Sequence, residues 1–174
     1  LNYEYAIEEL WLSPNNYLML AKNIKNNLID YTTSTVLKEA IEDRYREIEE
    51  ELSFMDAELR SVATEAKSEG NATLVVSSNK LLFLENYGFQ VIVLGDEVNE
   101  SISELFDDGD VSDIYLCDTD QKNEFITSLE SEYDANIINV DTMYTLTDEE
   151  ASGNATYLTI MRSFIDNIRN TTLG

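Results

Sequence analysis

The sequence predicts an α/β fold: a long spine helix followed by a four-stranded parallel sheet with helices on both of its faces. Three observations carry this prediction. From residue 34 to about residue 67 the apolar residues recur in steps of three and four, which is typical of one amphipathic helix of about nine turns. Beyond Gly70, short apolar runs alternate four times with helical segments, as in parallel sheets with crossover helices. The strands are apolar on both faces, which indicates burial between two layers of helices.

The spine helix carries an apolar stripe on one face and acidic residues on the opposite face. The stripe consists of Leu37, Ile41, Tyr45, Ile48, Leu52, Met55, Leu59, Val62 and Ala66. The acidic side chains, which we expect to be solvated, are Glu39, Glu42, Asp43, Glu47, Glu49, Glu50 and Glu58. Such a helix would be on the order of 50 Å long, which is longer than a domain of this size is wide. One arm of an antiparallel helical pair or coiled coil would fit the stripe about as well, and the alternation that follows favours a spine.

A second, shorter helix is predicted before the spine. Ser13 followed by Pro14 is typical of an N-cap and of proline at the first helical position, and the helix continues to about Ile29. Its apolar face holds Tyr17, Leu20, Ala21, Ile24 and Leu28. The hydroxyl-rich segment 32–35 ends this helix and caps the spine.

We expect the chain to divide into residues 1–69, with the N-terminal segment and both helices, and residues 70–174, the α/β lobe. The predicted strands cover residues 73–77, 90–94, 113–117 and 136–140. The predicted helices between and after them cover about residues 80–87, 100–106, 121–133 and 154–168.

Composition excludes several classes of function. Eleven Lys and Arg residues against 35 Asp and Glu give a formal net charge of -24 at pH 7, which disfavours nucleic acid and anionic membranes as partners. Such acidity favours solubility, the attraction of cations or a saline habitat. The chain has no histidine, so the commonest general base and transition-metal ligand are missing. Without a phosphate-binding glycine motif or a nucleophile with its base, we expect no enzyme.

The two ends of the sequence and its hydropathy bear on localisation. No run of 18 apolar residues occurs, so we expect no membrane span. The first residues, Leu-Asn-Tyr-Glu, are typical neither of an initiator nor of a signal peptide. We therefore expect a fragment of a longer protein.

Polar side chains collect where the predicted strands end. These ends are Ser77-Ser78, Gly95-Asp96, Cys117-Asp118 with Asp120 nearby, and Asp141. Ligands of open parallel sheets bind beyond the carboxyl ends of the strands, so an oxygen-rich cation site is one interpretation. Polar residues also begin wherever a strand leaves the core, and the pattern leaves both interpretations open. Cys117 has no basic neighbour to lower its pKa, so we expect it to be an inert core residue.

Several stretches resemble the zinc/manganese ABC-transporter solute-binding proteins. Residues 9–14 (E-L-W-L-S-P) are similar to the family's H-x-W-L-S-P-like stretch before the rigid helix that joins two α/β lobes. Residues 75–78 (V-V-S-S) resemble the family's V-V-S-H, and residues 157–162 (Y-L-T-I-M-R) its Y-L-x-x-M-R. The matches follow the family's order and cover nearly all of this chain. They correspond to the spine and C-terminal lobe of a family member, without its first lobe or its histidine-rich loop.

The resemblance implies an ion site between two lobes, with three ligand positions in this chain. Glu9 stands where the family has histidine, Ser78 where it has histidine or glutamate, and Asp141 retains the family's acidic residue. Tetrahedral zinc sites prefer nitrogen and sulfur donors, whereas two carboxylates and a hydroxyl suit Mn²⁺, Ca²⁺ or Mg²⁺. We therefore expect a degenerate site that binds a divalent metal ion (Zn, Mn or Ca) weakly or not at all, and no organic cofactor.

Two functions remain open, neither of them enzymatic. The first is the C-terminal lobe of an extracytoplasmic solute-binding protein, periplasmic or anchored at the cell surface, related to ABC-type metal-ion uptake. The intact protein would then meet the transporter's permease in the membrane. The alternative is a surface interaction or adhesion module that kept the scaffold and lost metal binding. An unrelated small α/β enzyme would need an acid-base or nucleophile constellation that the sequence lacks.

We also expect a weak homodimer. In a family member the stripe over residues 37–48 would partly meet the first lobe. Here it must be covered by the helix over residues 14–29 or by a second chain.

Overall fold

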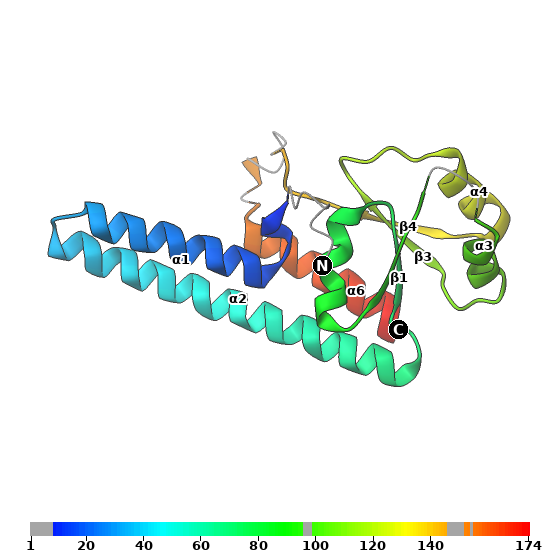
Figure 1. Cartoon of the computed structure of the whole chain (residues 1–174), viewed down its shortest axis with the longest axis horizontal. Helices are drawn as coiled ribbons and strands as arrows, with labels where there is room; N and C mark the ends of the chain where they lie inside the picture. The colour runs from blue at the N-terminus through cyan, green and yellow to red at the C-terminus, as the bar shows by residue number, and fades with distance from the viewer. Residues whose placement is uncertain (1–8, 96–98, 146–151, 154) are drawn as a thin grey trace, which may run out of the picture.

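The computed structural model describes residues 9–95, 99–145, 152–153 and 155–174. A hairpin of two long helices extends from a lobe that contains the sheet (Figure 1). In chain order the elements are η1 (Leu10–Leu12), α1 (Pro14–Tyr31), α2 (Thr35–Glu69), β1 (Thr73–Val76), η2 (Asn79–Tyr87), β2 (Gln90–Val93), α3 (Glu100–Asp107), β3 (Asp113–Cys117), α4 (Glu124–Tyr133), β4 (Asn136–Val140) and α6 (Tyr157–Leu173).

The four strands form one sheet in the order β2-β1-β3-β4, and each neighbouring pair is parallel. Val75 in β1 lies opposite Ile92 in β2 and Ile114 in β3. The predicted parallel sheet of four strands is therefore confirmed. Because its strands are parallel, all four carboxyl ends lie along the same edge.

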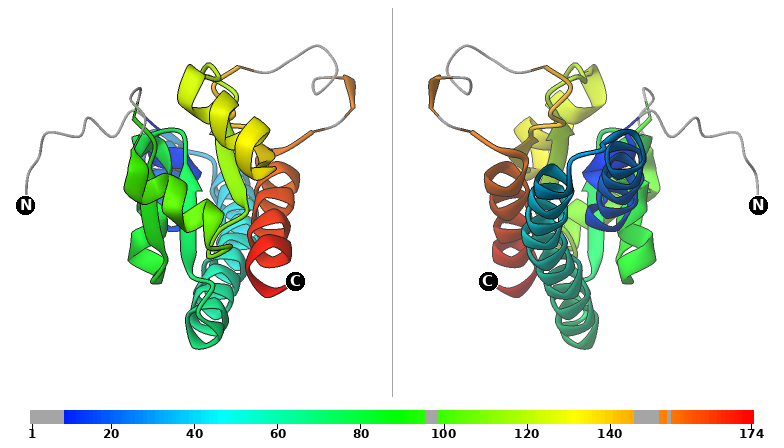
Figure 2. Two further views of the ribbon diagram at one scale, coloured as in Figure 1. Left: turned by 90° about the vertical axis from the view of Figure 1, so that its right-hand side faces the viewer. Right: turned by 90° about the vertical axis from the view of Figure 1, so that its left-hand side faces the viewer.

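Helices cover both faces of the sheet, as predicted. The first core cluster lies between the sheet and α2, η2 and α6, and it includes Leu59, Leu74 and Ile165. The second lies against α3 and α4 and includes Val75 and Leu129. Leu74 and Val75 are neighbours in β1, and successive side chains of a strand point to opposite faces. One strand therefore contributes to both clusters. Figure 2 shows α6 beside the C-terminal half of α2.

Helix α2 is the spine that the apolar stripe predicts. Ser34 caps its start, where the hydroxyl oxygen accepts a hydrogen bond from the backbone N–H of Leu37 at 3.4 Å. The helix stops at Gly70, whose φ of 87° lies in the left-handed region that favours glycine. The stripe is fully buried only from Leu52 onwards, where α2 packs under the lobe.

Helix α1 packs along the N-terminal half of α2 (Figure 1). Ser13 caps it and Pro14 occupies its first position, as predicted. It ends at Tyr31, two residues later than expected. Two residues of its predicted apolar face, Ile24 and Leu28, are exposed. The described part of the chain offers this end of α1 only α2 to pack against, because the hairpin extends beyond the lobe.

Two elements of the lobe differ from their predictions. η2 is a 3-10 helix and not an α-helix, and its buried residues Leu81, Leu84 and Tyr87 recur every three positions. That spacing matches a helix with three residues per turn. α4 begins at Glu124 rather than residue 121, because the side-chain oxygen of Asn123 caps it by accepting from the N–H of Ile126 at 2.9 Å.

Helix α6 is longer at its C-terminus than predicted. It ends at Leu173 rather than residue 168, and Leu173 packs against the first core cluster, which extends the apolar face of the helix. Its N-terminus has a capping box formed by Thr156 and Thr159. The predicted start, Asn154, lies outside the described residues.

The predicted solvation of the acidic face of α2 is wrong for Glu58. Arg169 of α6 donates a hydrogen bond to Glu58, and Arg162 of the same helix donates to Glu51. Each pair joins residues 111 positions apart, so the sequence could not indicate the partner. Both ion pairs join α2 to α6.

The expected division of the chain at residue 70 stays a prediction. None of the helices in the described part of the chain combines the length and the apolar content that crossing a membrane requires.

Candidate functional site

The carboxyl ends of β1 and β3 are joined by side-chain hydrogen bonds. The hydroxyl of Ser77, just after β1, donates to Asp120 Oδ2 at 2.7 Å. The same hydroxyl oxygen accepts from the backbone N–H of Cys117, the last residue of β3, at 3.0 Å. These contacts hold the two loops together at the edge where ligands of parallel sheets bind.

Lys80 brings a positive charge to this edge. Its Nζ donates to Thr119 Oγ1 at 2.6 Å and to Asp120 Oδ1 at 3.0 Å. Burial lowers the pKa of Lys80, but the hydrogen bond and charge of Asp120, together with the charge of Glu9, outweigh it and raise the pKa. The side chain therefore remains an ammonium ion at neutral pH.

The segment that carries Glu9 is fixed to the end of the sheet through Trp11. The indole Nε1 of Trp11 donates a hydrogen bond to the backbone oxygen of Thr142 at 2.8 Å. The backbone oxygen of Trp11 in turn accepts a hydrogen bond from the hydroxyl of Tyr157 at 2.7 Å. The rings of Tyr17 and Tyr157 stack with centroids 3.9 Å apart. Glu9 is 8% exposed, and its charge contributes to the raised pKa values of both Lys80 and Cys117.

Two further carboxylates follow β3 and β4. Asp118 Oδ1 accepts from both the backbone N–H of Thr142, at 3.0 Å, and its hydroxyl, at 2.6 Å. Asp141 Oδ1 accepts from the backbone N–H of Met143 at 2.7 Å. Met143 has a φ of 55°, and the hydrogen bond that its N–H donates to Asp141 stabilises this left-handed turn.

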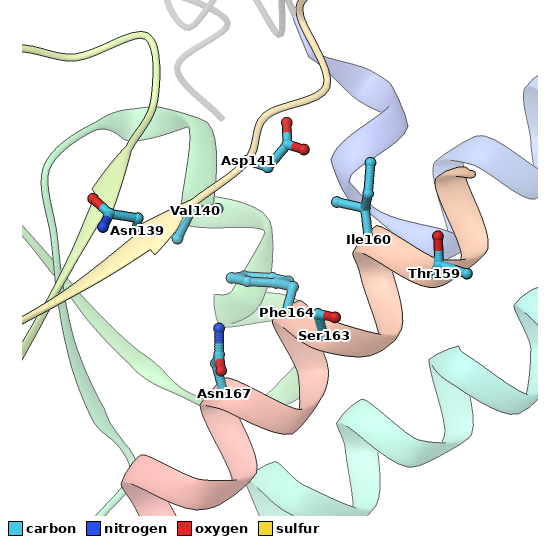
Figure 3. A pocket seen from close by; sticks show the side chains of 8 residues that line it. All are labelled: Asn139, Val140, Asp141, Thr159, Ile160, Ser163, Phe164 and Asn167. Atoms are coloured by element: carbon cyan, nitrogen blue, oxygen red, sulfur yellow. The ribbon is translucent and has the colours of Figure 1, made fainter. Parts of the chain in front are cut away.

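Asp141 also lines a small cavity between β4 and α6, which Figure 3 shows from close by. The cavity has a volume of about 260 Å³. Its lining combines apolar surface with hydroxyl, amide and carboxylate groups and consists of Asn139, Val140, Asp141, Thr159, Ile160, Ser163, Phe164 and Asn167.

Ser78, the third residue of the predicted ion site, caps η2. Its hydroxyl oxygen accepts from the backbone N–H of Lys80 at 3.3 Å. Ser78 and Glu9 therefore both lie near Lys80. Asp141 directly precedes Thr142, whose backbone oxygen accepts the hydrogen bond from Trp11. The role of Glu9, Ser78 and Asp141 as ion ligands stays a prediction. Asp96, at the end of β2, lies outside the described residues.

The donor chemistry at this edge does not fit zinc. Cys117 is fully buried, and burial, followed by the charge of Asp120, raises the pKa of its thiol to about 12. It is therefore a thiol at neutral pH, and zinc would have to displace its proton in order to bind. Across residues 9–95, 99–145, 152–153 and 155–174, no group of three or more His, Cys, Asp and Glu side chains is placed to hold a metal ion.

The sequence pattern placed Ser77 at this edge but did not indicate Lys80 or Trp11 as parts of it. A signal did exist for Lys80, because few of the 11 basic residues follow a strand end so closely. Its partner Asp120 is 40 positions away, and only the fold brings the two together.

Comparison with known families matches residues 8–171 to the one described as "Zinc-uptake complex component A periplasmic" (ZnuA). No curated protein sequence matches the chain.

Solved structures with the same fold include metal-binding proteins of bacteria. The metal-dependent lipoprotein YcdH from Bacillus subtilis has a TM-score of 0.80 at 20% identity, covering 100% of this chain and 67% of YcdH. The Zn(II)-bound ZnuA-like domain of Streptococcus pneumoniae AdcA has a TM-score of 0.71 at 19% identity, covering 94% and 63%. The periplasmic zinc-binding protein TroA from Treponema pallidum has a TM-score of 0.68 at 17% identity, covering 99% and 66%. The chain thus spans about two thirds of the length of these structures, and the likeness shows the fold.

Proposed function

The chain belongs to the ZnuA family of zinc-uptake components, and from this premise we propose that it is the spine and C-terminal lobe of an extracytoplasmic solute-binding protein with a degenerate ion site. The observation that carries the proposal is the family match over residues 8–171. The protein would hold its solute at the edge of the sheet and deliver it to the permease of an ABC transporter, without catalysis. The printed descriptions of TroA as periplasmic and of YcdH as a lipoprotein support an extracytoplasmic location.

The proposed ion-facing residues are Glu9, Ser78 and Asp141. All three offer oxygen, and oxygen ligands suit hard cations such as Mn²⁺ and Ca²⁺ better than zinc. Asp141 and Ser78 already take part in hydrogen bonds with backbone N–H groups. An ion would share these oxygens, so we expect its binding to be weak.

Isothermal titration calorimetry of the intact protein with Zn²⁺, Mn²⁺ and Ca²⁺ tests this assignment. We expect weak binding of Mn²⁺ or Ca²⁺ and a loss of at least tenfold in affinity in Asp141→Ala, which corresponds to about 1.4 kcal/mol or more. Asp113→Ala is a matched control, because Asp113 begins β3 and so lies at the opposite edge of the sheet. If no ion binds or shifts the melting temperature of the intact protein, ion capture is the wrong function.

The second candidate is a surface interaction or adhesion module that kept the scaffold and lost the ion. The observation that favours it is the ammonium of Lys80, which already pairs with Asp120 at the edge of the sheet where the ion is expected. This function would follow from the calorimetry if the intact protein bound none of the three cations.

We also propose a weak homodimer through the free end of the α1–α2 hairpin. Its exposed apolar side chains are Ile24, Leu28, Tyr31, Val36 and Leu37. Residues 13–46 hold five basic and four acidic side chains, whereas the rest of the chain holds six basic and 31 acidic ones. A second copy is therefore repelled everywhere except at this end, where apolar contact is available.

Sedimentation at increasing protein concentration tests the dimer. We expect the average mass to rise with concentration for the wild type and to stay that of a monomer for Leu37→Glu. Phe54→Ser is the control, since Phe54 is an exposed residue of α2 outside residues 13–46, and it should behave as the wild type. A wild-type chain that remains a monomer at high concentration contradicts the proposal.

A further inference from the structure

Lys80 forms a partly buried ion pair at the edge of the sheet where the ion is expected. Its Nζ lies 2.6 Å from Thr119 Oγ1 and 3.0 Å from Asp120 Oδ1. The side chains of Lys80 and Asp120 are 24% and 20% exposed, whereas those of the surface pair Arg44–Glu47 are 79% and 64% exposed. Exposed pairs contribute little because water screens them, and the Lys80 pair is screened less.

The surroundings hold the ammonium group in place. Asp120 uses one carboxylate oxygen for Lys80 and the other for the hydroxyl of Ser77. Ser77 is itself fixed by the backbone N–H of Cys117. Glu9, almost fully buried, acts on Lys80 through its charge. Asp120 thus pairs directly with the ammonium ion supplied by η2, and the charge of Glu9 acts on it from a second segment.

We propose that Lys80 is the specificity-determining residue of this edge. Its ammonium group supplies from within the chain the positive charge that a divalent cation would otherwise bring to the carboxylates there. A divalent cation that approaches Glu9, Ser78 and Asp141 meets this like charge beside Ser78. Repulsion between like charges is strong in a partly buried site. The inference rests on the proposed function, because it takes Glu9, Ser78 and Asp141 as the ion-facing residues.

Calorimetry with MnCl₂, CaCl₂ and ZnCl₂ at constant ionic strength tests the proposal on the intact protein. Lys80→Met keeps most of the side-chain stem and removes the charge, and we expect it to bind Mn²⁺ or Ca²⁺ at least tenfold more tightly than the wild type. Lys80→Arg keeps a positive charge and should bind as the wild type does. Lys122→Met removes the same charge from another lysine, which pairs with Glu130 at 2.6 Å, and should also leave the affinity unchanged.

A double variant tests whether the tighter cation binding depends on the carboxylate of Asp120, which Lys80→Met leaves without its ammonium partner. Lys80→Met combined with Asp120→Asn should lose the gain, because the oxygen that the ammonium had occupied no longer carries a charge. Lys80→Gln serves as the neutral variant if Lys80→Met does not fold, since its amide can still donate to Thr119. The proposal is overturned if the neutral variants bind cations no more tightly than the wild type, or if Lys122→Met gains as much.

These outcomes separate the inference from the proposed function. A wild type that binds no cation, with a neutral Lys80 variant that does, supports the inference and removes ion capture from the natural protein. Wild-type binding that depends on Asp141 but does not tighten in the Lys80 variants supports ion capture and overturns the inference.

Discussion

Replacing Leu59 with alanine is expected to lower the free energy of unfolding by about 3 kcal/mol, because it leaves a cavity where α2, the sheet and α6 meet. Leu59 is fully buried and lies in the first core cluster with Leu74 and Ile165. Because buried side chains from three packed elements surround Leu59, the site has little freedom to collapse into the space.

Urea unfolding followed by circular dichroism measures this effect as a shift of the midpoint at constant slope. Leu37→Ala is the matched control, since it makes the same chemical change in the same helix at a side chain that is 57% exposed. We expect it to change the stability by less than about 0.5 kcal/mol. Equal effects of the two substitutions would contradict the burial gradient along the spine.

Stability is expected to fall by roughly 6 kcal/mol between pH 9 and pH 12 through Cys117 and Tyr87 alone. Burial raises the pKa of Cys117 from 9.0 to about 12, and burial with the hydrogen bond to Asp56 raises that of Tyr87 from 10.0 to about 12. Burial also raises the pKa values of Tyr115 and Tyr157. Between the unfolded and folded pKa values only the unfolded chain releases these protons. The stability is therefore fully present below about pH 9 and is lost as the pH rises through this window.

The alkaline loss can be assigned by measuring the urea midpoint at several pH values. Cys117→Ala and Tyr87→Phe should each make the decline between pH 9 and pH 12 shallower, and the double variant more so. At pH 7 Tyr87→Phe should lose about 1 kcal/mol with its hydrogen bond to Asp56. A decline that is as steep in the double variant as in the wild type would show that other groups cause it.

The candidate site lies on the backbone fold of the family, but its side chains differ from those at the family's ligand positions. The backbone places strand ends and the Glu9 segment at one edge, but the groups found there are carboxylates, hydroxyls and one ammonium ion. Nitrogen donors from histidine are missing from the sequence. Which ligand this edge binds therefore depends on how far the positive charge of Lys80 offsets the negative charges of the nearby carboxylates.

Local patterns determined much of the fold. The apolar steps of three and four indicated α2, because a helix repeats its face at that period, and the alternation of strands with helices indicated the parallel sheet. Ser13 and Ser34 marked the helix starts because each caps through a neighbour three residues away. The 3-10 geometry of η2 could not be predicted, because residues 81–84 are all apolar and the three-residue spacing belongs only to the residues that the structure buries.

Only the tertiary structure decided which polar groups meet. Lys80 pairs with Asp120 across 40 positions, Arg169 with Glu58 across 111 and Trp11 with Thr142 across 131. A sequence pattern reports what a residue's own turn or strand requires, whereas the partner of a charged side chain depends on how distant elements pack. The sequence by itself thus determined the scaffold and the edge, and packing decided the charge balance at that edge.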